Sequence, residues 1–311
     1  MRKHSFRRRV FRRLAAGLCT ALLTLMLLPC AWADTTLYLE PDRTASLTVQ
    51  HITQGIAFRL YRVADVDNTI AFTPVAPFDR YSISFRRDMT AGEWQILANT
   101  LASYAVADHL PPLMEAETDE AGKVRWSSLK AGLYLVTADS YDVEENIYTI
   151  NPTLISLPNL QEDNWWQYDV TISPKWSVKP IERISLEVVK IWDDEGSAVV
   201  RPESITVELY RDGQLVDTVI LSQANNWRHT WTGLDNRNNW TVVERGIPDE
   251  YKVTIDQQGD TVIITNNAPS MTTPVPDLPQ TGQTWWPVPL LALCGMALFI
   301  LGWVKQRQGG K

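Results

Sequence analysis

Cysteine is almost missing from this chain of 311 residues, and its absence removes a common source of stability. The three cysteines, Cys19, Cys30 and Cys294, all lie in apolar stretches near the two ends. Residues 34–281 contain none, which excludes disulfides, cysteine nucleophiles and thiolate metal sites from this part of the chain. If this body is exported, it needs another source of robustness.

Positive charge is also scarce. Residues 34–281 hold all 36 acidic residues but only 19 of the 29 basic ones, a formal charge of −17. A surface this acidic argues against nucleic acid as a partner and favours solubility. The four histidines show no metal-ligand spacing, and no glycine-rich phosphate loop follows a strand. The sequence therefore indicates no metal, no cofactor and no turnover of an external substrate.

The N-terminus has the three parts of a secretory signal peptide. A basic cluster is followed by an apolar run from Leu14 to Leu28 and by the sequence Ala31-Trp32-Ala33. We expect cleavage of residues 1–33 between Ala33 and Asp34. A retained signal anchor is the alternative, and the small-x-small step argues against it.

The C-terminus contains a long stretch without charge. Residues 285–304 hold no charged side chain, and about twenty helical residues span roughly 30 Å, the thickness of a bilayer core. The tail 305–311 is basic, so the positive-inside rule keeps it in the cytoplasm and the body outside. The pattern predicts a membrane-spanning helix.

A short polar motif precedes this helix. Residues 278–282 read LPQTG, after a Pro- and Thr-rich segment 268–277 that we expect to be an extended spacer. The region 278–311 resembles the LPXTG sorting signal of Gram-positive surface proteins. The resemblance implies that a sortase recognises Leu278, Pro279, Gln280, Thr281 and Gly282. It further implies cleavage after Thr281, transfer of Thr281 to an amine, and membrane attachment only before sorting.

Short alternating strands dominate the body between the two ends. We predict an all-β fold of two tandem immunoglobulin-like sandwich domains, residues 34–175 and 185–267, joined by a linker at 176–184. One helix is predicted inside the first domain. Thr90 and Glu93 form a capping box, and apolar residues then recur at helical spacing.

Three strands of the second domain place one polar residue each on an inward, apolar face. Alternation puts Lys190 with Val188 in LEVVKIW, Glu244 with Val242 in NWTVVE, and Asn266 with Ile264 in VIITN. A buried polar group without a partner costs several kcal/mol, so we expect Lys190, Glu244 and Asn266 to meet.

Meeting would make a reaction possible. Burial lowers the pKa of a lysine and raises that of a glutamate, which favours a neutral amine and a protonated acid. The Lys190 amine then attacks the Asn266 side-chain carbonyl, with Glu244 moving the protons, and an amide cross-link replaces ammonia. A buried ion pair of Lys190 and Glu244 with Asn266 as hydrogen-bond partner is the alternative.

Residues 186–266 resemble a Cna protein B-type domain of Gram-positive surface proteins. The stretches LEVVKIWDDEG, WTVVERGIPDEY and ITN carry the resemblance. It implies that Lys190 and Asn266 form an intramolecular isopeptide bond and that Glu244 catalyses it. WTVVERGIPDEY also resembles the pilin E-box in Glu244, Pro248 and Tyr251, although Arg245 and Glu250 depart from the usual Thr and Gly.

Residues 166–175, WQYDVTISPK, resemble the pilin motif W-x-x-x-V-x-V-Y-P-K of sortase-assembled pilus backbones, with Ser173 in place of Tyr. The resemblance implies that Lys175 accepts the next subunit. Alternation places Lys175 on the outward face at the end of a strand, where it is accessible. An ordinary surface lysine is the alternative, and Lys179 is the next candidate. The first domain has no lysine before Lys123, so we expect no isopeptide bond of its own.

The combined pattern predicts a structural protein that is secreted and covalently anchored to the cell wall, a pilin subunit of the shaft or an accessory one. Its expected partners are a sortase, other pilin subunits or a peptidoglycan precursor. The alternative is a monomeric wall-anchored adhesin that binds a host or matrix ligand, in which Lys175 is idle.

Overall fold

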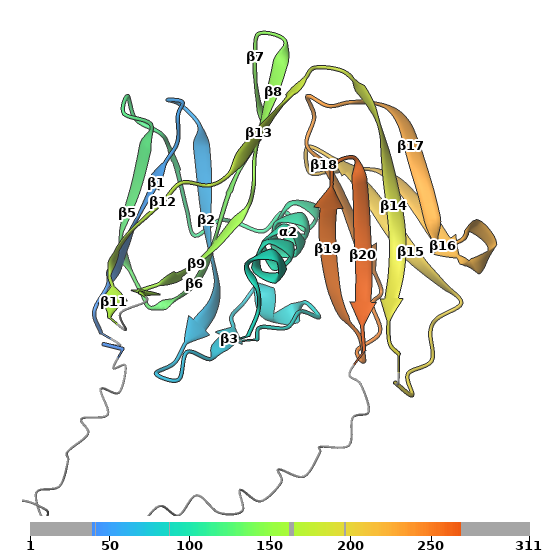
Figure 1. Ribbon diagram of the computed structural model, residues 1–311, viewed down its shortest axis with the longest axis horizontal. Helices are drawn as coiled ribbons and strands as arrows, with labels where there is room; N and C mark the ends of the chain where they lie inside the picture. The colour runs from blue at the N-terminus through green and yellow to red at the C-terminus, as the bar shows by residue number, and fades with distance from the viewer. Residues whose placement is uncertain (1–38, 41, 87, 162–164, 196, 269–311) are drawn as a thin grey trace, which may run out of the picture. The chain divides into compact units, whose positions relative to one another are not determined.

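The computed structural model describes residues 39–40, 42–86, 88–161, 165–195 and 197–268 (Figure 1). The predicted signal peptide, the spacer beyond residue 268, the LPQTG motif and the membrane helix lie outside these residues. Within the described ranges, no helix combines the length and the apolar character needed to cross a bilayer. Strands dominate both compact units of the chain, so the predicted all-β class is confirmed. The first unit is mainly residues 39–181 and the second mainly 182–268.

The first unit is built from two principal sheets around one core. One sheet has the order β12-β1-β5, and the other has the order β3-β2-β6-β9, with β4 also paired to β2. Its strands are β1 Ala45–Gln50, β2 Ala57–Val66, β3 Phe72–Pro74, β4 Met114–Glu117, β5 Lys123–Leu129, β6 Gly132–Ala138, β7 Tyr141–Val143, β8 Asn146–Ile150, β9 Thr153–Leu157, β10 Asn159–Leu160, β11 Trp166–Gln167, β12 Asp169–Ile172 and β13 Trp176–Pro180. The core between the sheets includes Leu47, Phe58, Leu60, Trp126 and Tyr134.

The predicted helix is present as α2, Ala91–Ala107, and it follows a short 3₁₀ turn, η1 Phe78–Arg80. Thr90 is its N-cap, and the capping box with Glu93 is formed in both directions. Leu97, Leu101 and Tyr104 are buried, as their helical spacing predicts. The helix packs on strands β6 and β9 and so forms a side element of the sandwich (Figure 1).

Residues 176–180 lie within the predicted linker but form strand β13. This strand pairs with β8 in a small antiparallel sheet of order β13-β8-β7. All five of its residues are exposed, so no buried face marks the strand, although Trp176 and Val178 alternate with polar residues in its sequence.

The second unit is a sandwich of a four-stranded and a three-stranded sheet. The orders are β17-β14-β20-β19 and β16-β15-β18. Its strands are β14 Arg183–Asp193, β15 Ser204–Arg211, β16 Gln214–Ser222, β17 Arg228–Asp235, β18 Trp240–Arg245, β19 Lys252–Gln258 and β20 Thr261–Asn267, with a 3₁₀ turn, η2 Gln223–Asn225. The first strand β14 and the last strand β20 are parallel neighbours, and Lys190 pairs with Ile264 while Trp192 pairs with Asn266.

Loss of the helix cap should weaken the first unit measurably. We expect Thr90→Ala to lower the free energy of unfolding by about 1 kcal/mol, because it leaves an amide at the helix N-terminus without its acceptor. Chemical denaturation measures the change. Thr90→Asp keeps an acceptor at the same place and should stay close to the parent; an equal loss in both variants would contradict a capping role.

Candidate functional site

Three strands bring Lys190, Glu244 and Asn266 together inside the second sandwich. Lys190 and Asn266 come from the neighbouring strands β14 and β20 of one sheet, and Glu244 comes from β18 of the facing sheet. The residues are 5 %, 1 % and 0 % exposed. Alternation works as predicted on all three strands, because the neighbours Val188, Val242 and Ile264 are buried on the same inward faces.

Glu244 bridges the two other residues. Its Oε2 lies 3.6 Å from Lys190 Nζ, an ion pair beyond hydrogen-bonding distance, and both side chains are fully buried. Its Oε1 accepts a hydrogen bond of 2.8 Å from Asn266 Nδ2. Lys190 Nζ also donates to the carbonyl oxygen of Ile191 at 3.0 Å. The carbonyl oxygen Oδ1 of Asn266 is buried and accepts no hydrogen bond from the described residues.

Burial shifts both titrations toward the neutral forms. Desolvation lowers the pKa of Lys190 to about 8, although the charge of Glu244 opposes this shift. Desolvation raises the pKa of Glu244, against the opposing effects of Lys190 and of the Asn266 hydrogen bond. The directions are those expected for charged groups moved into an apolar interior. A proton can therefore pass from the ammonium to the carboxylate at modest cost, which leaves an amine beside a carboxylic acid.

One aromatic ring lies over the amine, and two further rings pack against that ring. Lys190 Nζ lies 4.2 Å from the centroid of the Trp192 ring. Trp192 in turn contacts Trp227 and Tyr251 edge-on, at centroid distances of 5.3 and 5.2 Å. Alternation places Trp192 on the inward face, but its contact with the Lys190 amine was not predicted.

A second charged group next to the site was missed by sequence reasoning. Asp194 follows β14 directly and accepts hydrogen bonds from Arg201 Nε at 2.6 Å and from the Tyr251 hydroxyl at 3.1 Å. The opposite charges within the short stretch between β14 and β15 were a weak signal for this ion pair.

The first unit holds apolar residues where the second holds its polar site. Its first strand β1 and strand β12, the last strand of its two principal sheets, are also parallel neighbours, with Leu47 beside Val170 and Val49 beside Ile172. Leu47, Val49 and Val170 are buried in its core. No lysine occurs on β1, so the arrangement of Lys190 and Asn266 has no equivalent on this strand pair.

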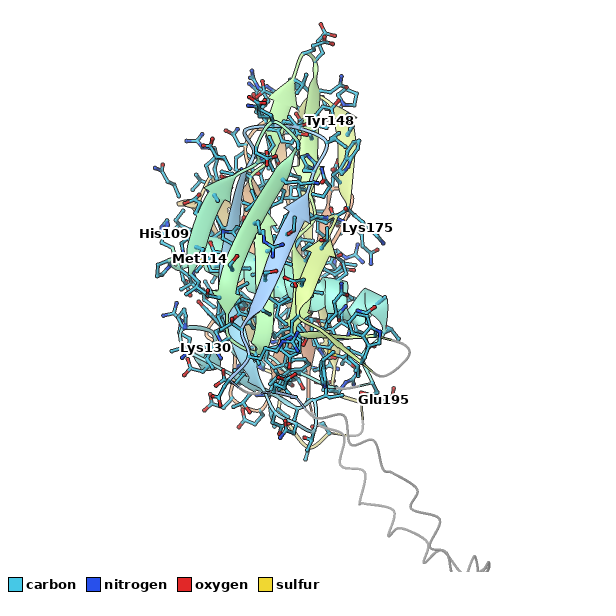
Figure 2. All side chains as sticks on the ribbon, turned by 90° about the vertical axis from the view of Figure 1, so that its left-hand side faces the viewer. His109, Met114, Lys130, Tyr148, Lys175 and Glu195 are labelled. Atoms are coloured by element: carbon cyan, nitrogen blue, oxygen red, sulfur yellow. The ribbon has the colours of Figure 1, made fainter. Side chains whose placement is uncertain are left out.

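Lys175 lies at the surface of the first unit, between β12 and β13 (Figure 2). Pro174 before it is buried, and the carbonyl oxygen of Lys175 accepts a hydrogen bond of 2.8 Å from the Asn151 amide, which fixes the backbone. The side chain is exposed, as alternation predicts. A groove of about 400 Å³ lined by His51, Ser173 and Trp176, among others, lies next to this segment.

The remaining predicted site residues fall outside the described part of the chain. These are Ala33 and Asp34 at the signal cleavage site and Leu278, Pro279, Gln280, Thr281 and Gly282 of the sorting motif. Among the residues that are described, no group of three or more His, Cys, Asp or Glu side chains could hold a metal ion.

Comparison with known proteins identifies the second unit. Residues 186–267 match the family model of the Cna protein B-type domain, so the resemblance predicted for these residues is confirmed. A collagen adhesin of Staphylococcus aureus is 41% identical over 85 residues, which make up 27% of this chain and 7% of that protein. The chain thus spans only a small part of this curated relative.

Solved structures of surface proteins are also similar. Two B repeat units of the collagen binding protein of S. aureus align with 73% of this chain and 50% of their own, with 21% identity and a TM-score of 0.27. The full-length major pilin SpaD from Corynebacterium diphtheriae aligns with 74% of this chain and 66% of its own, with 13% identity and a TM-score of 0.29. The shaft pilin SpaA from Lactobacillus rhamnosus GG aligns with 74% and 99%, with 16% identity and a TM-score of 0.24.

A variant in which the cross-link cannot form should show a change in the free energy of unfolding with pH. In an Asn266→Ala variant the Lys190 amine stays free. Its pKa is about 8 in the folded state and about 10.5 when unfolded, so the unfolded state binds more protons between these values. Stability should therefore rise with pH across this window, by up to about 3 kcal/mol.

Calorimetry of the exported chain measures this rise. The double variant Asn266→Ala/Lys190→Met provides the control, because it keeps every other titrating group. If the single and double variants follow the same curve between pH 8 and 10.5, folding does not lower the pKa of Lys190.

Proposed function

We propose that Lys190 and Asn266 become joined by an isopeptide bond and that Glu244 catalyses its formation. One observation carries the proposal: the two oxygens of Glu244 lie beside the two nitrogens that must exchange a proton. Lys190 Nζ must lose protons to become a nucleophile, and Asn266 Nδ2 must gain one to leave as ammonia.

The reaction starts with transfer of a proton from the Lys190 ammonium to Glu244, which burial favours on both sides. The Nζ lone pair then attacks Cγ of Asn266. As the bond from Cγ to Nδ2 breaks, Glu244 gives its proton to Nδ2, takes the second proton from Nζ, and ammonia departs. Protonated Glu244 could also polarise the side-chain carbonyl of Asn266. For this the Asn266 amide must first rotate by half a turn about the Cβ–Cγ bond, which exchanges the positions of Oδ1 and Nδ2.

The bond supplies the robustness that cysteine cannot. It joins the first strand of the second unit to the last, so that both ends of the domain are covalently held. A pulling force applied between the two ends of the domain would then pass through this link without extending the sheet. The proposed role is structural, with a single intramolecular turnover and no external substrate.

The larger proposal concerns the whole chain. We infer a secreted precursor whose LPQTG motif is cut by a sortase after Thr281 and whose product is a wall-anchored pilin subunit. Lys175 is the proposed acceptor for the next subunit, supported by its exposed side chain and its fixed backbone. A peptidoglycan precursor is the proposed acceptor at the cell wall, and a host or matrix ligand remains the partner of the alternative adhesin.

The intact mass tests the cross-link. The exported chain should weigh one ammonia less than its sequence predicts, because the amide bond forms with loss of one molecule of NH₃. Lys190→Ala, Asn266→Ala and Glu244→Gln should each restore the full mass. Asn267→Ala, one residue further along β20, should keep the deficit. A parent protein at full mass would refute the bond.

A ladder of covalent polymers tests Lys175. In cells that express a polymerising sortase, Lys175→Ala should abolish the high-mass series on the surface. Lys130→Ala removes another exposed lysine of the first unit and should leave the series intact (Figure 2). A ladder that persists without Lys175 would move the role elsewhere, first to Lys179. A single anchored species in the parent would favour the monomeric adhesin.

A further inference from the structure

The end of strand β14 carries a charge pair that no step of the reaction uses. The side chain of Asp194 is only 7% exposed, and it accepts hydrogen bonds from the Arg201 guanidinium and from the Tyr251 hydroxyl. Arg201 itself is half exposed. The pair therefore joins a buried carboxylate to a solvated guanidinium at the edge of the site.

The pair lies against the ring that covers the reacting amine. The guanidinium carbon of Arg201 is 5.9 Å from the centroid of the Trp192 ring, and Lys190 Nζ is 4.2 Å from the same centroid. Tyr251, which binds Asp194, packs edge-on against Trp192. Asp194, Arg201 and Tyr251 thus hold the indole in place over Lys190.

We propose that Asp194 and Arg201 are positioning residues for the isopeptide reaction, which fix Trp192 over the Lys190 amine and balance the charge felt by the proton shared between Lys190 and Glu244. The inference rests on the proposed cross-link and extends it to residues that touch neither reacting atom.

The charges of Asp194 and Arg201 shift the pKa of Lys190 in opposite directions. The charged groups that act on Lys190 are Glu244 from the facing sheet, Asp194 at the end of β14 and Arg201 from the following loop. Asp194 stabilises the ammonium and Arg201 destabilises it, so their effects on the pKa of Lys190 oppose each other. Removal of either one leaves the other uncompensated, and the two removals act in opposite directions.

The shared proton makes this measurable. Transfer of a proton from Lys190 to Glu244 leaves the net charge of the pair unchanged. The rate of ammonia loss should therefore not depend on pH as long as Lys190 and Glu244 share this transferable proton, and it should fall at the alkaline pH where the proton is lost to solvent. Arg201→Met should move the alkaline fall to higher pH and lower the plateau, because the ammonium is then favoured. Asp194→Asn should move the alkaline fall to lower pH. We expect shifts of roughly 0.5 pH unit, limited by the exposure of Arg201.

The experiment follows the loss of ammonia after folding. The exported chain is made by cell-free translation, unfolded at once in guanidinium, and refolded by dilution into neutral and alkaline buffers. Intact mass gives the reacted fraction against time at each pH. Arg183→Met is the matched control: it removes the same charge seven positions away on the same strand, about 23 Å from Lys190.

Opposite shifts of the alkaline limb in Arg201→Met and Asp194→Asn, with Arg183→Met unchanged, support the proposal. Arg201→Lys keeps the charge and should restore the parent profile, which decides the question even if Asp194→Asn fails to fold. A uniform loss of rate in both variants without opposite shifts would overturn the proposal while leaving the cross-link intact. Absence of ammonia loss in the parent would refute the cross-link itself.

Discussion

The buried contact between Lys190 and Glu244 is the constraint on which the second unit depends. An ion pair with both side chains fully buried is costly to desolvate, and an apolar pair of the same volume would often be as stable or more so. Its presence in a sandwich core therefore points to chemistry. The same desolvation that makes the ion pair unfavourable lowers the pKa of the lysine and raises that of the glutamate, and so favours the neutral amine and acid that the proposed reaction needs.

The two units solve the same topological problem in different ways. In each, the first strand is a parallel neighbour of the last strand of the two principal sheets, β1 of β12 and β14 of β20. The first unit closes this contact with Leu47, Val49 and Val170 in an apolar core. The second places Lys190 and Asn266 there, which gives up apolar burial but permits a covalent link. In a chain whose body has no cysteine, the proposed link would take the place of a disulfide.

Accessibility separates the two lysines of interest. Lys190 is enclosed by Trp192 and reacts, as proposed, only within its own domain. Lys175 is exposed on a backbone fixed by Asn151, as an acceptor for another molecule must be. Lysines are few in the body of the chain. Burial decides which of them can form a bond within the domain and which can accept another molecule.

The sequence by itself determined which faces of the strands turn inward. The alternation around Lys190, Glu244 and Asn266 and the capping box at Thr90 are local patterns of period two and of helical spacing, and both hold in the structure. Strand β13 was predicted as part of the linker, because the alternation of Trp176 and Val178 with polar residues is short and no buried face accompanies it.

Only the tertiary structure decided how the inward groups meet. Lys190 and Asn266 become neighbours through the parallel pairing of β14 with β20, and Glu244 reaches both from the facing sheet. The ion pair of Asp194 and Arg201 beside Trp192 depends likewise on where the chain folds back after β14. The contacts among Lys190, Glu244 and Asn266 join residues far apart in the sequence, and no local period encodes the distance or the direction between two strands in different sheets.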